Sequence, residues 1–223
     1  MIERRFVIPD IHGCFRTFRS LLADVIRLQK EDSLYLLGDT IDRGPRSREV
    51  LDSILRLQSE GFKVNPLRGN HEEMLLTSCR DRSMFHLWML NGGHATLASF
   101  GVEDGCDIPP SYRDFIAGWP TFIKLADFIL VHAGLNFRIA DPFADTEAML
   151  WSRDTFIDTG WLGGRRLVCG HTPLPLEEIQ ISLGYDRIML DNGCVYKGEA
   201  SMGCLAALEL NSMRLYFQEN TDV

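Results

Sequence analysis

Aspartate, asparagine and histidine residues recur in five short glycine-containing segments of this 223-residue chain. The segments are Asp10–Gly13, Gly38–Gly44, Gly69–Glu72, His132–Gly134 and Gly170–His171, and they hold four of the chain's 6 histidines. Carboxylate oxygens and imidazole nitrogens suit Mn²⁺, Fe or Zn²⁺ better than soft metal ions. Together the segments predict a shared metal site, although each fragment alone is a common turn.

Each segment follows a short apolar run that is typical of a β-strand. Runs at 5–9, 33–37 and 64–67 alternate with stretches at 15–28 and 50–57, where apolar residues recur at helical spacing. This β-α-β-α-β order predicts a parallel sheet with crossover helices. Ligand sites in such sheets lie at the carboxyl ends of the strands, so the segments should meet at one edge.

The rest of the chain changes character along its length. Residues 72–119 are expected to be helical and loop-rich, with a loop at 101–110. The last hundred residues favour strands. The strand candidates are 122–125, 128–131, 166–169, 179–183, 187–190, 204–210 and 214–218, with a turn at Asn211–Ser212.

Composition excludes several classes of protein. Asp plus Glu is 31 and Lys plus Arg is 23, so the net charge of −8 argues against a broad basic surface for nucleic acid. No apolar stretch is long enough to suggest a membrane span, and the first residues lack the pattern of a signal peptide. The 6 cysteines show no CxxC spacing, which favours reduced thiols and a cytoplasmic protein. No linker divides the chain, so residues 1–223 are expected to form a single domain.

The motifs DxHG, GDxxDRG, GNHE, HAG and GH resemble those of the calcineurin-like metallophosphoesterases. Within that superfamily they are most similar to the phosphoprotein phosphatases of the compact bacteriophage lambda type. The resemblance spans Asp10 to His171 and implies the α/β metallophosphatase fold, classed as α+β in some schemes. In that fold two β-sheets pack as a sandwich flanked by helices, with the metals at the loops of one sandwich edge.

The resemblance also implies a role for each matching residue. The implied metal ligands are Asp10 and His12 for the first ion, Asp39 for both ions, and Asn70, His132 and His171 for the second. His71 resembles the catalytic acid and Asp42 the carboxylate that orients it. The implied phosphate-binding residues are Arg43, Arg153 and Asn70. Two divalent metal ions are the expected cofactors, Mn²⁺ first, with Fe or Zn²⁺ as alternatives.

The implied reaction is attack of a metal-bridging hydroxide on phosphorus, with His71 protonating the leaving alkoxide. Two divalent ions minus Asp10, Asp39 and one hydroxide leave a local charge of about +1, and the two arginines raise it to about +3. A chain of net charge −8 can thus attract a phosphate dianion. The predicted partner is a phosphorylated protein or peptide, with small phosphoesters as further substrates and neither nucleic acid nor membrane as a partner.

Three functions remain open. The first is a protein serine/threonine phosphatase. The second is a bis(5'-nucleosyl)-tetraphosphatase or another hydrolase of small phosphoesters. Symmetrical tetraphosphatases typically carry Ala in place of Asp42 and Asp in place of Glu72, so these residues favour the first. The third, a non-catalytic scaffold, is disfavoured because no ligand or acid is missing.

A few other residues remain secondary candidates. The aromatic side chains of Trp88, Tyr112 and Trp161 could form an adenine-stacking surface. The segment Asp191–Gly193 is interpreted as a turn rather than as a support for the site, and Cys14 as a thiol packed behind the first metal loop.

Overall fold

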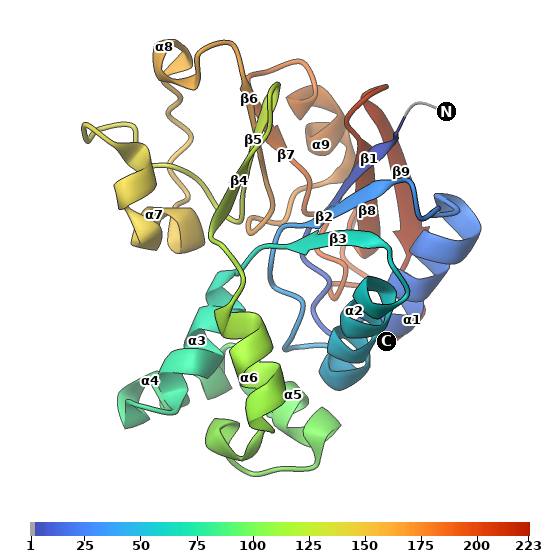
Figure 1. Ribbon diagram of the computed structural model, residues 1–223, viewed down its shortest axis with the longest axis vertical. Coiled ribbons are helices and arrows are strands. Elements are labelled where there is room, and N and C mark those ends of the chain that lie inside the picture. The colour runs from blue at the N-terminus through green and yellow to red at the C-terminus, as the bar shows by residue number, and fades with distance from the viewer. Residues whose placement is uncertain (1–2) are drawn as a thin grey trace.

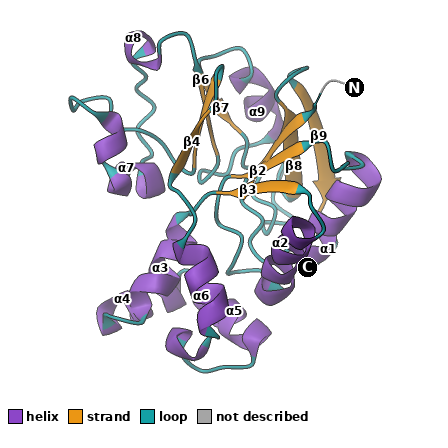
Figure 2. Ribbon diagram, viewed as in Figure 1, coloured by secondary structure: helices purple, strands orange, loops and turns teal. Residues whose placement is uncertain are grey.

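The computed structural model describes residues 3–223 as two β-sheets with helices on their outer sides (Figures 1 and 2). The first sheet has the strand order β3-β2-β1-β8-β9, and the second has the order β4-β5-β6-β7. The strands are β1 (Arg5–Ile8), β2 (Ser33–Leu36), β3 (Lys63–Pro66), β4 (Phe122–Lys124), β5 (Phe128–Val131), β6 (Arg166–Cys169), β7 (Arg187–Met189), β8 (Cys204–Glu209) and β9 (Arg214–Glu219). The predicted α/β class with two packed sheets is confirmed. Residues 1–2 of the predicted domain lie outside the described residues.

Parallel pairing places the carboxyl ends of neighbouring strands at the same edge of each sheet. Strands β1, β2 and β3 are parallel, and so are β5, β6 and β7. The first crossover is α1 (Phe15–Ser20), which continues as a π-helical turn over Leu21–Val25, and the second is α2 (Ser47–Ser59). The predicted β-α-β-α-β start is therefore confirmed, and the loops after its strands lie on one side of the molecule.

Alternate residues of the central strands pack into different hydrophobic cores, one on each face of the sheet. Because both faces are buried, these strands contain uninterrupted apolar runs. Phe6 and Ile8 of β1 pack with the helices on the outer face of the first sheet, whereas Val7 faces the second sheet. In β5 the same alternation directs Leu130 between the sheets and Ile129 outward. The resulting arrangement of helices, two sheets and helices encloses three cores, and this close packing holds loops from both sheets in one place.

Short helices follow β3 and form a separate lobe in Figure 1. This helical lobe comprises α3 (Asn70–Ser78), α4 (Arg82–Leu90), α5 (Gly93–Phe100), a 3₁₀ turn at Gly105–Asp107, and α6 (Pro110–Ala117). The predicted helical middle is confirmed. A second group of short helices flanks the other sheet: a 3₁₀ turn at Pro142–Ala144, α7 (Thr146–Trp151) and α8 (Thr159–Leu162).

One strand prediction is wrong. The segment 179–183 belongs to helix α9 (Leu176–Ser182) rather than to a strand. The parallel pairing of β6 with β7 requires a crossover connection, and a helix is the usual one. Acidic Glu177 and Glu178 in its first turn and buried Ile179 fit that role. The other strand candidates are confirmed to within a residue or two, including the turn that joins β8 to β9.

Among residues 3–223, no helix combines the length and apolar character needed to cross a membrane.

Candidate metal centre and active site

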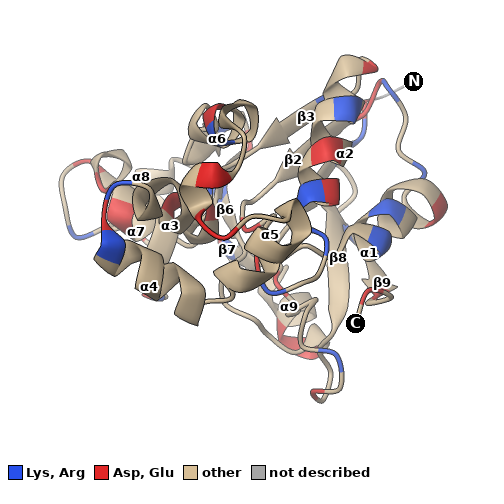
Figure 3. Cartoon of the chain, turned by 90° about the horizontal axis from the view of Figure 1, so that it is seen from below, with Lys and Arg blue, Asp and Glu red and all other residues tan. Residues whose placement is uncertain are grey.

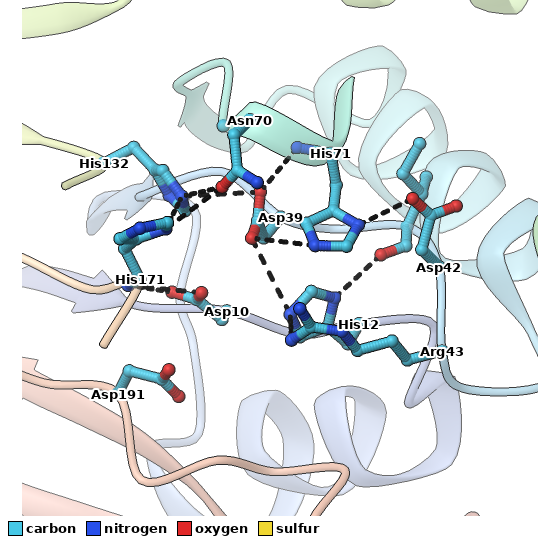
Figure 4. Close-up of polar contacts among 12 residues, drawn as sticks. Asp10, His12, Asp39, Asp42, Arg43, Asn70, His71, His132, His171 and Asp191 are labelled. Carbon is cyan, nitrogen blue, oxygen red and sulfur yellow. Dashed lines mark hydrogen bonds and ion pairs between the residues drawn. The ribbon is translucent and has the colours of Figure 1, made fainter. Parts of the chain in front are cut away.

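The five motif segments converge where the two sheets meet. Figure 4 shows their side chains grouped around Asp39, which follows β2. The loops after β1 and β2 and the start of α3 bring donors from the first sheet, and the loops after β5 and β6 bring histidines from the second. Two groups of side chains are close enough to hold a metal ion: His12, Asp39 and His71, and Asp39, His132 and His171.

The donor group around His132 is compact, and two acceptor atoms meet in it. His132 Nδ1 donates to the Leu37 carbonyl at 2.9 Å, so the lone pair of neutral His132 lies on Nε2. That Nε2 atom lies only 2.8 Å from Asn70 Oδ1, another acceptor, and 3.1 Å from His171 Nδ1. Acceptors this close are stabilised by a cation between them. The set therefore fits a divalent ion.

Asp39 is shared between the two donor groups. Its Oδ1 lies 3.5 Å from His132 Nε2, while its Oδ2 lies 3.7 Å from His12 Nε2 and 3.8 Å from His71 Nε2. The backbone N–H of His71, in the first turn of α3, donates to Oδ1 at 3.0 Å. A helix N-terminus stabilises an anion placed there. The carboxylate is thus positioned with one oxygen toward each group.

In the donor group around His12, a backbone contact orients the imidazole and the guanidinium of Arg43 lies beside it. His12 Nδ1 donates to the Ile41 carbonyl at 2.9 Å, which leaves Nε2 as the coordinating atom. Arg43 Nη1 lies 2.8 Å from that Nε2 and donates to it. Asp10 accepts the backbone N–H of His171 at 3.0 Å, so a residue of the second sheet orients a ligand candidate of the first.

Burial shifts the pKa of Asp10 and Asp39 and of three histidines at the site. Desolvation raises the pKa of Asp10 and of Asp39 well above the usual aspartate value, and neighbouring carboxylates add to the effect. Desolvation lowers the pKa of His12 and His132 well below the usual value. It lowers the pKa of His171 to about 4, with Arg153 and His71 as further causes. Neutral imidazoles beside buried carboxylates form a site that gains stability from bound cations.

His71 is held from behind and points into the site. Its Nδ1 lies 2.7 Å from Asp42 Oδ2, and its buried Nε2 has no hydrogen-bond partner. Asp42 is in turn held by the Trp88 indole N–H at 2.7 Å and by the Thr96 hydroxyl. These contacts fix the imidazole orientation and leave Nε2 available to a group that enters the site.

The site opens to solvent through a cavity of about 100 Å³. The residues lining it are Asp39, Arg43, Asn70, His71, Asn91, Trp151, Arg153 and His171. Arg153 is exposed at the rim, with Nη1 3.4 Å from Thr172 Oγ1, whereas Arg43 lies deeper. Cationic groups on two sides of a cavity this small suit one phosphoryl group.

Backbone conformation at the site is strained in a systematic way. Many of the described non-glycine residues with positive φ are candidate site residues, with φ between 46° and 71°: His12, Asp39, Asp42, Arg43 and His171. Such conformations cost free energy, so the surrounding packing must enforce them. Glycines make room as well, because a Cβ at Gly170 would collide with Asp10 Oδ1 and one at Gly69 with Asp39 Oδ1.

The supporting roles of three buried residues were not predicted from the sequence. Glu72 is fully buried and accepts the N–H groups of Asp39, Thr40 and Gly69 at 2.7–2.9 Å, so it ties the β2 loop to α3. Its place in the GNHE motif was the available signal. Trp88 and Thr96 carried none, because they reach Asp42 only through folding of the helical lobe.

Asp191 combines the turn predicted for it with a place at the site. It accepts the Gly193 N–H at 2.7 Å and lies buried near Asp10 (Figure 4). Desolvation raises the pKa of Asp191 to about 6. The buried Cys14 thiol packs behind the first loop, 3.5 Å from the His12 carbonyl, as predicted.

The suggested adenine-stacking aromatics do not face the cavity. Trp88 is fully buried against Asp42, Tyr112 packs edge-on to Phe100, and Trp161 packs against Phe143. Trp151 is the aromatic residue in the cavity lining.

Known proteins are similar to this chain in sequence and in fold. A serine/threonine-protein phosphatase 1 from Salmonella typhimurium is 29% identical over 212 residues, covering 88% of this chain and 89% of that protein. A symmetrical bis(5'-nucleosyl)-tetraphosphatase from an Acidovorax species is 41% identical over 162 residues, covering 67% of this chain and 52% of that protein. The match thus spans about half of the tetraphosphatase.

A solved protein serine/threonine phosphatase from Saccharomyces cerevisiae, described as similar to human phosphatase PP5, has the same fold. It superimposes with a TM-score of 0.64 at 16% identity and covers 99% of this chain and 81% of that one. The family model for calcineurin-like phosphoesterases matches residues 4–206. With the His and Asp clusters compatible with divalent metal ions, this match shows that the chain belongs to the calcineurin-like phosphoesterase family.

Proposed function

We propose that this metallophosphoesterase is a protein serine/threonine phosphatase. The observation that carries the proposal is the His71–Asp42 pair, whose unpartnered Nε2 belongs to a residue that lines a cavity of about 100 Å³. A pair of this kind can protonate a leaving group, and a cavity of this size holds little beyond one phosphoryl group.

The proposed roles follow from position. Asn70, His132, His171 and Asp39 would hold one divalent ion, and Asp10, His12 and Asp39 the other. Bound divalent ions would activate water and neutralise charge on the phosphoryl oxygens. Arg43 and Arg153, which line the cavity, would bind the non-bridging oxygens with their planar guanidinium groups. His71 would then donate the proton on Nε2 to the oxygen that leaves.

The leaving group distinguishes the substrate classes. Serine and threonine alkoxides are strong bases and leave slowly without a proton, so a positioned acid accelerates their departure. The phosphate groups released from a dinucleoside polyphosphate are far weaker bases and need little help. An Asp42 carboxylate fixed by Trp88 and Thr96 is therefore best explained by an alkyl phosphoester substrate.

A dinucleoside polyphosphate remains the second candidate substrate. The Acidovorax tetraphosphatase has the higher identity, 41%, although over a smaller share of this chain than the Salmonella phosphatase. Trp151 lines the cavity and edges His171, so it offers one aromatic surface to a base. Most of a dinucleotide would still lie outside a cavity of about 100 Å³.

The deciding experiment compares two substrates on one metal-loaded preparation. We expect kcat/KM for a phosphothreonine peptide to exceed that for diadenosine tetraphosphate. If the dinucleotide is preferred tenfold or more, about 1.4 kcal/mol of transition-state stabilisation, the second candidate replaces the first.

A variant tests the role of the acid. His71→Asn should lose about 10²–10⁴-fold in rate on phosphoserine and less on p-nitrophenyl phosphate, whose phenolate leaves readily. The control is His94→Asn, which changes an exposed histidine on α5. Equal losses on both substrates would show that His71 is not the general acid.

A further inference from the structure

Two pairs of neighbouring cysteines lie in different surroundings, and all six cysteines are free thiols. Cys14 and Cys194 are buried in the core behind the first metal loop, where the Asn220 side-chain amide donates to Cys14 Sγ and to the Cys194 carbonyl. Cys79 and Cys106 lie at the surface of the helical lobe, Cys79 half-buried and Cys106 exposed. The two pairs are chemically alike, so their access to solvent distinguishes them.

The surface pair joins the two ends of a loop. Cys79 ends helix α3, whose first residues are Asn70 and His71, and Cys106 lies in the 3₁₀ turn after α5. The Cys106 thiol donates a hydrogen bond to the Cys79 carbonyl oxygen, with 3.6 Å between the sulfur and the oxygen. Arg113 Nη1 lies 3.9 Å from Cys79 Sγ.

We propose that Cys79 and Cys106 are an oxidisable dithiol, which hydrogen peroxide converts to a disulfide that closes the base of the helical lobe. The proposal does not depend on which phosphoester the enzyme hydrolyses.

The surroundings assign the two thiols different parts. The Arg113 guanidinium lies beside Cys79 Sγ, and cysteines that react with peroxide commonly lie beside such a cation. Contact with Cys79 raises the pKa of Cys106 to about 11, as expected for a thiol that keeps its proton and donates a hydrogen bond. Cys79 therefore attacks the peroxide, and Cys106 resolves the product.

The step balances without another reactant. The Cys79 thiolate attacks one peroxide oxygen, the O–O bond breaks, and the released hydroxide takes up a proton to give water and Cys79 sulfenic acid. Cys106 sulfur then attacks the sulfenic sulfur, the S–O bond breaks, and the Cys106 proton leaves with the hydroxide as a second water. Two thiols are oxidised by two electrons, and one peroxide is reduced to two waters.

The segment between Cys79 and Cys106, which the disulfide would close into a ring, contains the residues that hold Asp42 beside the candidate acid His71. Between the two cysteines lie Trp88 and Thr96, which hold Asp42, and the Gly92 carbonyl, which accepts the Arg43 N–H at 3.2 Å. In Figure 3, α4 and α5 are almost free of charged residues, so few ion pairs brace this part of the lobe. An exposed ion pair, Arg82 with Asp104, lies near the loop ends and contributes little. A disulfide would therefore add a constraint where few exist.

The experiment oxidises the full-length protein with stoichiometric hydrogen peroxide and maps disulfides by mass spectrometry of unreduced digests. We expect a Cys79–Cys106 linkage, reversed by dithiothreitol, with Cys14 and Cys194 still free. The melting temperature should rise by about 5–10 °C on oxidation. Cys106→Ser should show neither the linkage nor the rise, and the control Cys204→Ser should behave like the wild type.

A third measurement, the retention of activity on heating, distinguishes a disulfide that stabilises the helical lobe from one that has no effect on it. Near the reduced protein's melting point, oxidised enzyme should keep its phosphoserine activity longer, because Asp42 remains supported. Cys79→Ala offers an independent variant if Cys106→Ser folds poorly. Linkage of Cys14 to Cys194 before the surface pair, or a Cys79–Cys106 linkage without a rise in melting temperature, would overturn the proposal.

Discussion

The two halves of the candidate metal centre differ in how close together their donor atoms lie. On the second-sheet side, His132 Nε2, His171 Nδ1 and Asn70 Oδ1 lie 2.8–3.1 Å from one another. On the first-sheet side, His12 Nε2 lies 3.7 Å from Asp39 Oδ2, and the Arg43 guanidinium already contacts the imidazole. In the second-sheet half, two acceptor atoms lie side by side, and no cationic side chain among residues 3–223 is in contact with them. In the first-sheet half, the cationic side chain of Arg43 contacts His12.

This difference suggests a division of labour. The convergent half is set to bind a metal ion without rearrangement, since its acceptors are already in place. In the other half the Arg43 side chain, which contacts His12 Nε2, would have to move away before a metal ion could bind there. A phosphoryl group that draws Arg43 toward itself would favour that movement. The predictions below test whether the halves behave so differently.

Metal removal should have the largest effect. Chelation should abolish hydrolysis of p-nitrophenyl phosphate, and Mn²⁺ should restore it. At a metal concentration 100 times the dissociation constant, binding contributes about 2.7 kcal/mol, or a rise of about 5–10 °C in melting temperature. Elemental analysis of fully active enzyme should find two ions, and one ion or none would contradict the two-metal site.

The size of that rise should depend on pH. In the metal-free fold the lowered pKa of the histidines keeps them neutral near pH 7, while the raised pKa of Asp10 and Asp39 favours their protonated forms. Metal must therefore displace protons from carboxylates, so its stabilising effect should grow from pH 5 to pH 8. Lowered histidine pKa values also mean that the metal-free protein loses stability as pH falls from about 6.5 toward 4. Calorimetry with and without Mn²⁺ across this pH range measures the effect. A metal-induced rise in melting temperature that becomes smaller as the pH increases would contradict the assignment of the carboxylates as metal ligands.

Asp39→Asn should be the most damaging single substitution, because Asp39 is the residue common to both halves. We expect a loss of about 10³-fold or more in kcat/KM for p-nitrophenyl phosphate, with fewer than two ions bound. The matched control is Asp127→Asn, which changes an exposed aspartate paired with Arg5 on the protein surface. Retention of two ions by Asp39→Asn would show that the carboxylate is not shared.

Arg43→Ala should separate the halves. Without the guanidinium, no side-chain cation competes with a metal ion for His12 Nε2. The affinity for the ion that binds at His12 should therefore stay the same or rise. KM for a phosphomonoester should rise about 10–100-fold because a bidentate donor is lost. Isothermal titration and steady-state kinetics measure the two effects. A fall in metal affinity would mean that Arg43 supports the site rather than competes for it.

Thr96→Val should have the smallest effect. It removes a hydroxyl that donates to buried Asp42 while keeping the side-chain shape, and a hydrogen bond to a charged group contributes about 1.5–3 kcal/mol. We expect a loss of about tenfold on phosphoserine, a smaller loss on p-nitrophenyl phosphate, and unchanged metal binding. Thr96→Ser should recover most of the activity.

The strand ends and the motifs on them were predictable because both depend on local pattern. The apolar runs before Asp10, Asp39 and Asn70 made strands, and parallel pairing then fixed a common edge. The contacts of Trp88 and Thr96 with Asp42 were not predictable, since they join residues 46 and 54 positions apart through helices whose packing no local pattern encodes. The strand predicted at 179–183 failed because the crossover geometry outweighed its apolar residues.

The backbone hydrogen bond from His171 to Asp10 joins residues 161 positions apart, and the donors of the metal centre span nearly as much of the chain. Closing so long a loop is slow, and it must precede any complete coordination sphere. Metal ions should therefore find their full ligand set only after both sheets have packed together. Bound Mn²⁺ would then leave the refolding rate nearly unchanged and slow unfolding, so that the metal acts chiefly as a kinetic lock on the native state.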